Sequence, residues 1–516
     1  MAGAGRIQKS AKNMASGIAY RVLSLLTAFV VRTVFLHYLN TDYLSVNGLY
    51  SSVLSMLSLA ELGFSTAMVY NMYRPLAEKD YQKLRQLMLL YKRVYAVIGT
   101  VILVLGLCVV PFLDVIIKNK PDLPGLTFYY LLFLGDSVLS YWFFAYRTSI
   151  LQADQRAYIV TNYNGIFNLI KSFLQILLLV LTHNFTVYLL TQIGCTIAQN
   201  VVIAIRVGKE YPVFNKGEND RLPAEEKRAI FKDVKALMLQ KVSFRVLNTS
   251  DSIIISAFVG VNWVGLLSNY LMVEEAVVAV LSQITGAITA SLGNYFAVED
   301  REAGYTLFRR IEFMNYFFYS FSAIALITLL TPFITVWLGV DYTLSRFIVI
   351  ALIARFYVEG YMNIMSAFRS TLGLFVQGQY LPLVVAALNI ALSIGLSFPF
   401  GVAGVLLATP LARLCINAWF MPYVIHKHGF HKPVVPFYLR YVGRIALVVI
   451  ITIMMQLLSN AIFTGGVTII KFTAMTVLTG VLPILLLSAA FYRTDEFRYF
   501  MDLVIGTVKT RILHRG

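Results

Sequence analysis

The stretch "LMLQKVSFRVLNTSDSIIIS", residues 237 to 256, is long enough to cross most of a bilayer, yet it contains Lys241, Arg245 and Asp251. An ionised side chain at the centre of a membrane helix costs about 2.5–3.5 kcal/mol on insertion scales. A helix that bears three such residues needs neighbours that surround the charges with polar groups or water. The stretch therefore predicts one helix among many in a membrane protein.

The composition of the whole chain supports this prediction. The 516 residues are 58% hydrophobic and only 13% charged, with a mean hydropathy of +0.72, whereas soluble proteins average about 25% charged residues. Apolar runs of about 20–25 residues recur along the chain, each near the length that spans a hydrocarbon core of about 30 Å. The sequence lacks the alternating ten-residue strands of a membrane barrel. We predict an all-α polytopic membrane protein.

The apolar runs predict fourteen membrane spans. They lie near 15–39, 44–71, 94–117, 126–150, 158–182, 185–206, 236–259, 264–293, 313–338, 344–369, 380–399, 401–425, 440–463 and 466–491. Basic residues concentrate in alternate loops, so the positive-inside rule places both termini and the 207–235 loop in the cytoplasm. This asymmetry explains the net charge of +17 without nucleic acid as a partner. The basic N-terminus precedes an apolar stretch that lacks a small-residue cleavage site, which predicts a retained first span.

The long interruption at 207–235 suggests two lobes, which a weak internal repeat supports. A shift of 220 residues places Tyr43 on Trp263 and Tyr50 on Tyr270 without a gap. We expect two pseudo-symmetric six-helix lobes, a recurrent plan among transporters. The expected divisions are an N-terminal lobe (1–206), a cytoplasmic linker (207–235), a C-terminal lobe (236–425), and two further spans with a cytoplasmic tail (426–516).

Several spans carry cations on one helical face. Lys241 and Arg245 are four residues apart in the seventh span, and Arg21 and Arg32 are eleven apart in the first, its counterpart in the repeat. The candidate binding residues are Arg21, Arg32, Lys241, Arg245, Lys171 and Arg355. Basic residues outnumber acidic ones within the spans, and a cationic cavity concentrates anions. We therefore expect a substrate that bears phosphate, carboxylate or both.

Each of these charges also has a structural interpretation of about equal weight. Lys and Arg near helix ends can extend to the membrane surface, and Arg355 can pair with Glu359 one turn away in its own helix. The acids Asp251, Glu359 and Asp136 are candidates for coupling to a proton or sodium gradient.

The sequence shows no pattern typical of catalysis or of a bound cofactor. It has no phosphate-binding loop motif, no set of nucleophile, histidine and acid, and only three widely spaced cysteines. The short tract "HKHGFH" (426–431) lacks supporting acids. We expect no enzyme activity, no cofactor and no metal site.

Three stretches resemble the polysaccharide transporter branch of the multidrug/oligosaccharidyl-lipid/polysaccharide exporter superfamily, which includes Wzx-type flippases. They are "LSLAELGFSTAMVYNMYRPLAEKD" (57–80), "TSDSIIISAFVGVNWVGLLSNYLMV" (249–273) and "YLPLVVAALNIALSIGLSFPFGVAGVLLATPLAR" (380–413). The resemblance implies a V-shaped fold of two lobes that works by alternating access. It also implies a substrate of undecaprenyl-pyrophosphate-linked oligosaccharide units, moved across the bacterial cytoplasmic membrane for capsule, exopolysaccharide or O-antigen assembly. A polysaccharide polymerase and glycosyltransferases are the implied partners.

Two other transport functions stay open at this point. A flippase for peptidoglycan precursors would need the same cationic cavity, because its substrate has the same anionic carrier. An ion-coupled multidrug exporter of the same superfamily would need acids in the cavity, so the basic excess argues against it. A scaffold protein without transport activity is disfavoured, because polar faces on so many membrane helices cost free energy unless they line a cavity.

Overall fold

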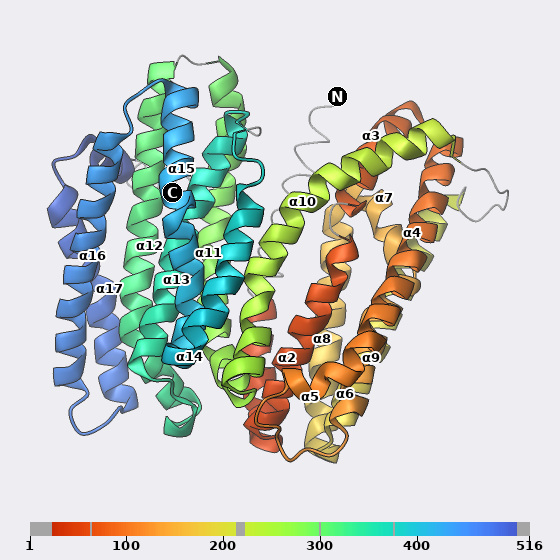
Figure 1. Cartoon of the computed structure of the whole chain (residues 1–516), viewed down its shortest axis with the longest axis horizontal. Helices are drawn as coiled ribbons and strands as arrows, with labels where there is room; N and C mark the ends of the chain where they lie inside the picture. Colours follow the sequence, from red (N-terminus) through yellow and green to blue (C-terminus); the bar gives the residue numbers. More distant parts are fainter. Residues whose placement is uncertain (1–22, 62–63, 213–221, 299–300, 375–376, 503–516) are drawn as a thin grey trace, which may run out of the picture. The chain divides into compact units, whose positions relative to one another are not determined.

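The computed structural model describes residues 23–61, 64–212, 222–298, 301–374 and 377–502 (Figure 1). Within these residues all regular structure is helical, with short 3-10 and π segments between the α-helices and no strand. The predicted all-α fold class is confirmed. Contacts between residues divide the chain into two compact units, Met1–Gly265 and Leu266–Gly516.

The N-terminal unit begins, in its described part, with the apolar helix Leu23–Tyr38. Its other α-helices are α2 (Thr41–Leu57), α3 (Phe64–Glu78), α4 (Tyr81–Val109), α5 (Leu113–Ile116), α6 (Leu126–Trp142), α7 (Thr148–Ala153), α8 (Ala157–Thr182), α9 (Phe185–Glu210) and α10 (Ala224–Ile254). Helix α6 packs against both α4 and α9, and α8 packs against α9. Helix α10 contacts α2 and α3.

Several of the spans expected in this unit are broken helices, including those at 44–71 and 126–150. The span expected at 44–71 consists of α2, a 3-10 segment at Ser58–Glu61, and α3. The span expected at 126–150 bends by 44° between α6 and the segment Ala145–Ala153. Phe144 adopts a left-handed φ of 59° at that bend, a conformation that an α-helix cannot continue. Hydropathy detects apolar length but not backbone breaks, so the sequence predicted continuous helices.

The C-terminal unit contains nearly all of α11, whose first turn holds the boundary between the units. Its α-helices are α11 (Asn262–Val298), α12 (Arg301–Trp337), α13 (Arg346–Thr371), α14 (Leu381–Cys415), α15 (Asn417–Val424), α16 (Val435–Ile462) and α17 (Ile469–Phe491). Helix α13 packs between α12 and α14, and α12 also contacts α16 and α17.

Helix α14 is two helices that fold back on each other at Gly401. This glycine has φ 56° and ψ −134°, values that lie outside the helical region. The buried Asn389 and Thr409 side chains, on opposite sides of the turn, are hydrogen-bonded at 2.9 Å. The apolar helical stretch Leu381–Phe430 has 50 residues, which would measure about 75 Å if straight, far more than a hydrocarbon core of about 30 Å. The turn therefore allows the two crossings that the sequence predicts here.

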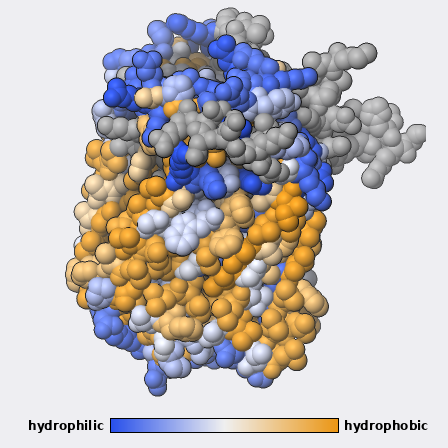
Figure 2. Space-filling model, turned by 90° about the vertical axis from the view of Figure 1, so that its right-hand side faces the viewer, coloured by the Kyte–Doolittle hydropathy of each residue, from blue (hydrophilic) through white to orange (hydrophobic). Residues whose placement is uncertain are grey.

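Nine helices among the described residues are long and apolar enough to cross a membrane, or up to eleven if each bent pair is one span. This number counts the folded stretch Leu381–Phe430 once and excludes the shorter helix Leu23–Tyr38, so it is roughly compatible with the expected fourteen. Figure 2 shows a broad hydrophobic band on the face of the N-terminal unit, with hydrophilic residues at both ends. Such a band is the surface that a bilayer requires.

The predicted boundary of the C-terminal lobe at residue 236 stays a prediction, because it rests on the symmetry of a repeat. The packing of α10 against α2 and α3 places this helix in the N-terminal compact unit.

Gly404→Ala is expected to destabilise the protein, because a Cβ at this position would lie 2.0 Å from the Leu396 carbonyl oxygen across the α14 turn. Forcing the two halves apart should cost about 1–3 kcal/mol. The matched control is Gly395→Ala in the same helix, where nothing lies within 4 Å and alanine should add about 0.5–1 kcal/mol. Thermal unfolding in detergent measures both variants, and an unchanged midpoint for Gly404→Ala would contradict the close approach.

Candidate functional site

A half-buried carboxylate lies at the break between α2 and α3. Glu61 ends the 3-10 segment, and its two oxygens accept hydrogen bonds from Tyr95 at 2.5 Å and Tyr141 at 2.7 Å. Tyr91 donates in turn to the Tyr95 hydroxyl at 3.1 Å. These tyrosines come from α4 and α6 and are themselves buried. Neutral hydroxyl groups thus satisfy this acid, and no cation among the described residues forms an ion pair with it.

Helix α10 places two cations beside the same break. The Lys241 ammonium donates to the Thr66 hydroxyl of α3 at 2.6 Å, and the Arg245 guanidinium donates to the Ser55 hydroxyl of α2 at 3.0 Å. Arg245 also lies within electrostatic reach of Tyr141. Neither cation forms an ion pair with a residue that the structure describes. Hydroxyl partners orient a cation but do not neutralise it, so this half-buried pair keeps its charge available to an anion.

The candidates of the first span are only partly placed. Arg21 lies outside the described residues. Arg32 is half-buried on the helix Leu23–Tyr38, and its electrostatic neighbour is Tyr188 of α9. The structure therefore brings Lys241 and Arg245 together at the α2–α3 break and places Arg32 beside α9.

The polar face of α8 serves mainly to join helices. Asn164 accepts from Gln199 of α9 at 3.0 Å, and Asn168 donates to Ser24 at 3.3 Å. Lys171 lies between them and Gln175 along this face, half-buried near Cys195, and forms no ion pair within the described part of the chain. The amides of this stripe thus have a structural role, and Lys171 remains as its charged member.

Two of the three candidate coupling acids lie in the N-terminal unit. Asp136 of α6 accepts a hydrogen bond from Gln192 of α9 at 2.7 Å. Asp251 lies near the end of α10 and is 5% exposed. Asp251 is thus buried, and Asp136 is half-buried and hydrogen-bonded between α6 and α9.

In the C-terminal unit the candidate charges are paired between helices. Arg355 of α13 lies 2.9 Å from Glu274 of α11, with side chains 15% and 5% exposed. Glu359, one turn further along α13, lies 3.4 Å from Arg413 of α14. Arg355 and Glu359 are thus each paired with a residue of another helix. The resulting row of alternating charge has no net excess to attract an anion.

A third buried pair was missed by the sequence analysis. Arg444 of α16 donates to both oxygens of Glu312 of α12, at 2.9 and 2.6 Å. Its guanidinium also lies over the rings of Phe313 and Tyr316, at 5.3 and 5.0 Å from their centroids. Glu312 directly precedes the span expected at 313–338, and Arg444 lies near the start of the span expected at 440–463. The pair attaches α16 to the rest of the C-terminal unit.

Comparisons with known proteins identify the fold. No family model and no curated protein sequence matches the chain. Among solved structures, the lipid II flippase MurJ in an inward closed conformation has a TM-score of 0.65 at 16% identity, over 93% of this chain and 98% of its own. An inward-facing multidrug resistance MATE family transporter has a TM-score of 0.57 at 14% identity, over 80% and 97%.

A third solved structure has the same fold with a different site. It is a transporter of the MOP superfamily (the multidrug/oligosaccharidyl-lipid/polysaccharide exporters) from Pyrococcus furiosus, described as having a binding pocket of reverse polarity. Its TM-score is 0.51 at 13% identity, over 82% of this chain and 96% of its own. The chain thus has the fold of MOP-superfamily transporters, and at these identities the likeness concerns the fold alone.

Arg355→Met is expected to destabilise the protein by about 3–5 kcal/mol, because it leaves Glu274 buried without its partner. The double variant Glu274→Gln/Arg355→Met should recover most of this loss, since it removes both charges. Arg346→Met, at an exposed position in the first turn of the same helix, is the matched control. Thermal and denaturant unfolding in detergent compare the variants. A single variant as stable as the wild type would show that the pair has no structural role.

Proposed function

We propose that the protein is a flippase that moves an anionic, lipid-linked oligosaccharide across the bacterial cytoplasmic membrane. The expected substrate is an undecaprenyl-pyrophosphate-linked glycan unit for capsule, exopolysaccharide or O-antigen synthesis. A polysaccharide polymerase and glycosyltransferases would then act on either side of the transport step. The fold of MOP-superfamily transporters supports movement of a substrate across the bilayer.

The observation that carries the proposal is the location of Lys241 and Arg245 and the kind of partner that each has. Both lie in an apolar helical unit at a helix break, and both have hydroxyl partners. Broken helices are where transporters commonly bind their substrates. A pyrophosphate that loses water on entering such a site needs cations, and these two have no carboxylate partner to displace among the described residues. The lipid tail can stay in the bilayer while the polar head crosses.

A flippase for peptidoglycan precursors is the second candidate. The favouring observation is the similarity to MurJ, whose structure aligns over a larger share of this chain than the MATE structures do. Both candidates use the same cations and differ only in the glycan. Export of cationic drugs receives less support, because Glu61, Glu274 and Glu359 already bind tyrosines or arginines.

Lys241→Ala/Arg245→Ala is expected to reduce export of the lipid-linked glycan at least tenfold. Each contact to a charged group contributes about 1.5–3 kcal/mol, and about 1.4 kcal/mol is one decade in rate or affinity. The charge-conserving variant Lys241→Arg/Arg245→Lys should keep part of the activity. The control is Arg228→Ala/Lys232→Ala, which removes two exposed cations at the same spacing on the same helix.

The measurement is complementation of a deletion strain, normalised to the amount of each variant in the membrane, together with flipping assays in proteoliposomes. Full activity of the Lys241→Ala/Arg245→Ala protein would overturn the anion-site argument. Flipping of lipid II but not of other lipid-linked glycans would establish the second candidate instead.

The same proposal fixes the orientation in the membrane. With both termini cytoplasmic, an exposed cysteine introduced at Asp122 should react with an impermeant maleimide in intact cells, and one at Arg228 should react only after lysis. Both positions are exposed on the protein surface. Labelling of the Arg228 position in intact cells would reverse the orientation.

A further inference from the structure

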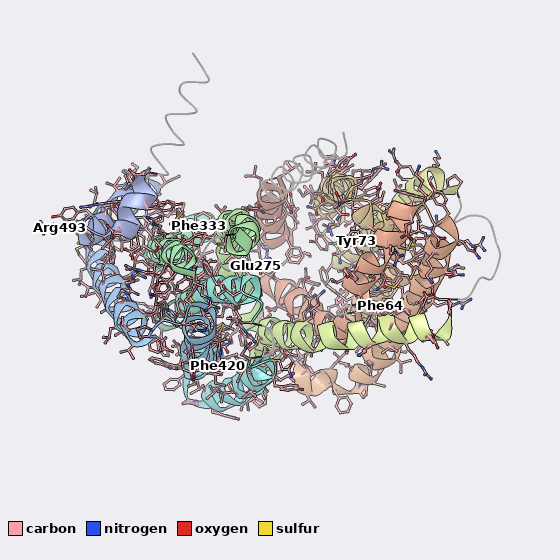
Figure 3. The ribbon with its side chains drawn as sticks, turned by 90° about the horizontal axis from the view of Figure 1, so that it is seen from above. Phe64, Tyr73, Glu275, Phe333, Phe420 and Arg493 are labelled. Carbon is pink, nitrogen blue, oxygen red and sulfur yellow. The ribbon has the colours of Figure 1, made fainter. Side chains whose placement is uncertain are left out.

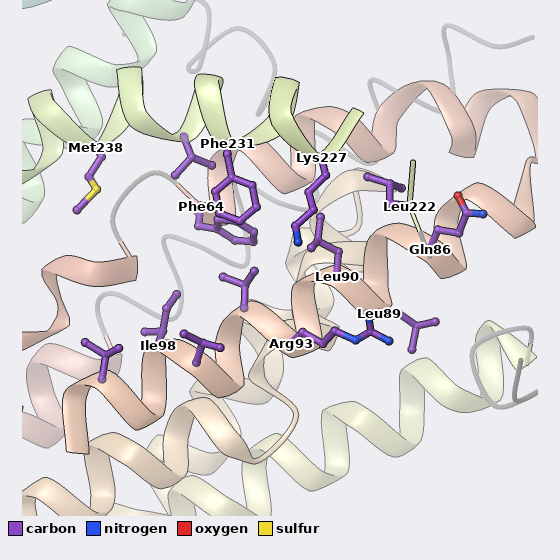
Figure 4. Close-up of a pocket in the computed structure, with 14 residues that line it drawn as sticks. Phe64, Gln86, Leu89, Leu90, Arg93, Ile98, Leu222, Lys227, Phe231 and Met238 are labelled. Atoms are coloured by element: carbon purple, nitrogen blue, oxygen red, sulfur yellow. The ribbon is translucent and has the colours of Figure 1, made fainter. Parts of the chain in front are cut away.

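A cavity of about 790 Å³ lies between α4 and α10 in the N-terminal unit (Figure 4). Its walls are largely apolar and include Val94, Val97 and Val101 of α4 and Phe231 and Met238 of α10. Phe64 of α3 also lines the cavity, and its ring centroid lies 5.8 Å from that of Phe231. Figure 3 shows Phe64 beside α10. We refer to this cavity as the α4–α10 groove.

Two cations lie partway along the α4–α10 groove, between Leu222 and Gln86 on one side and Ile98 and Met238 on the other. Lys227 and Arg93 both line it, and Figure 4 shows the Lys227 ammonium directed down from α10 toward α4. The nearby acid Glu226 is already paired with Lys83 of α4. Within the described residues neither Lys227 nor Arg93 forms an ion pair. The groove therefore combines apolar walls with two cations that have no acidic partner among the described residues.

The part of the α4–α10 groove that runs from Arg93 to Val101 matches one leaflet of a bilayer in length. Eight residues separate Arg93 from Val101 on α4, which is about 12 Å along a helix. Half of a hydrocarbon core of about 30 Å is about 15 Å. Arg93 directly precedes the expected span at 94–117, so the cations lie at the level of lipid headgroups and the channel extends into the hydrocarbon. Val97 is 61% exposed and Phe231 is 42% exposed, as expected of a wall that a lipid chain covers.

We propose that the α4–α10 groove binds an anionic phospholipid of the surrounding bilayer. The phosphate lies between Arg93 and Lys227, and one acyl chain lies along Val94, Val97 and Val101. Juxtamembrane cations attract anionic headgroups. The bound lipid would contact both α4 and the start of α10. The packing of α10, which carries Lys241 and Arg245, would then depend on the lipid composition of the membrane.

The leaflet-length channel favours a phospholipid over the polyprenyl carrier, whose chain is much longer than one leaflet. This inference does not depend on the transported substrate, because binding is measured without transport.

The test uses the purified full-length protein in detergent, titrated with phosphatidylglycerol or phosphatidylcholine and followed by native mass spectrometry. We expect phosphatidylglycerol to bind more tightly than phosphatidylcholine. Arg93→Ala/Lys227→Ala should weaken phosphatidylglycerol binding roughly 10- to 30-fold. The control Lys92→Ala/Arg228→Ala removes the adjacent exposed cations, which do not line the groove, and should leave binding unchanged. Val97→Trp fills the channel without a change of charge and should also reduce binding.

Several outcomes would overturn the proposal. An equal loss in the Lys92→Ala/Arg228→Ala control would mean general surface attraction, and equal binding of phosphatidylcholine would remove the role of the phosphate charge. Binding of glycerol phosphate as tight as that of the lipid would reduce the groove to an anion site. Displacement of phosphatidylglycerol by equimolar undecaprenyl phosphate would assign the groove to the carrier lipid. Unchanged binding by Val97→Trp would show that no acyl chain enters it.

Discussion

The cost of an uncompensated charge inside apolar helices is the constraint on which the rest of this structure depends. In the C-terminal unit it is met by ion pairs between helices, such as Arg355 with Glu274 and Arg444 with Glu312. Removing one member of such a pair leaves the other as a buried charge without a partner. The pairs therefore also favour one arrangement of neighbouring helices. In the N-terminal unit the same cost is met for Glu61 by tyrosine hydroxyl groups.

The described charges thus fall into two groups, those that an opposite charge neutralises and those whose partners are hydroxyl groups. Charges that neutralise each other hold helices together and offer little to a ligand. Lys241 and Arg245 differ because their partners are hydroxyl groups, which can be exchanged for an anion without leaving a carboxylate unpaired. Their position at the break between α2 and α3 adds polar backbone and side-chain groups to the site.

Fold and function are only loosely connected in this architecture. The solved structures that share it include a lipid II flippase, a multidrug transporter and a protein with a binding pocket of reverse polarity. The charge in the site, rather than the arrangement of helices, must then select the substrate. Among the described residues of the N-terminal unit, cations lie at the α2–α3 break and in the α4–α10 groove.

The sequence by itself determined the all-α membrane fold, because hydropathy reports directly which segments prefer lipid to water. Helical periodicity also placed Lys241 and Arg245 on one face, since four residues make about one turn. Only the tertiary structure decided which charges are compensated. Glu274 and Arg355 are 81 residues apart and Glu312 and Arg444 are 132 apart, and no local pattern identifies partners at such separations. The helix break at Glu61 was equally invisible, because a break changes backbone geometry without interrupting an apolar run.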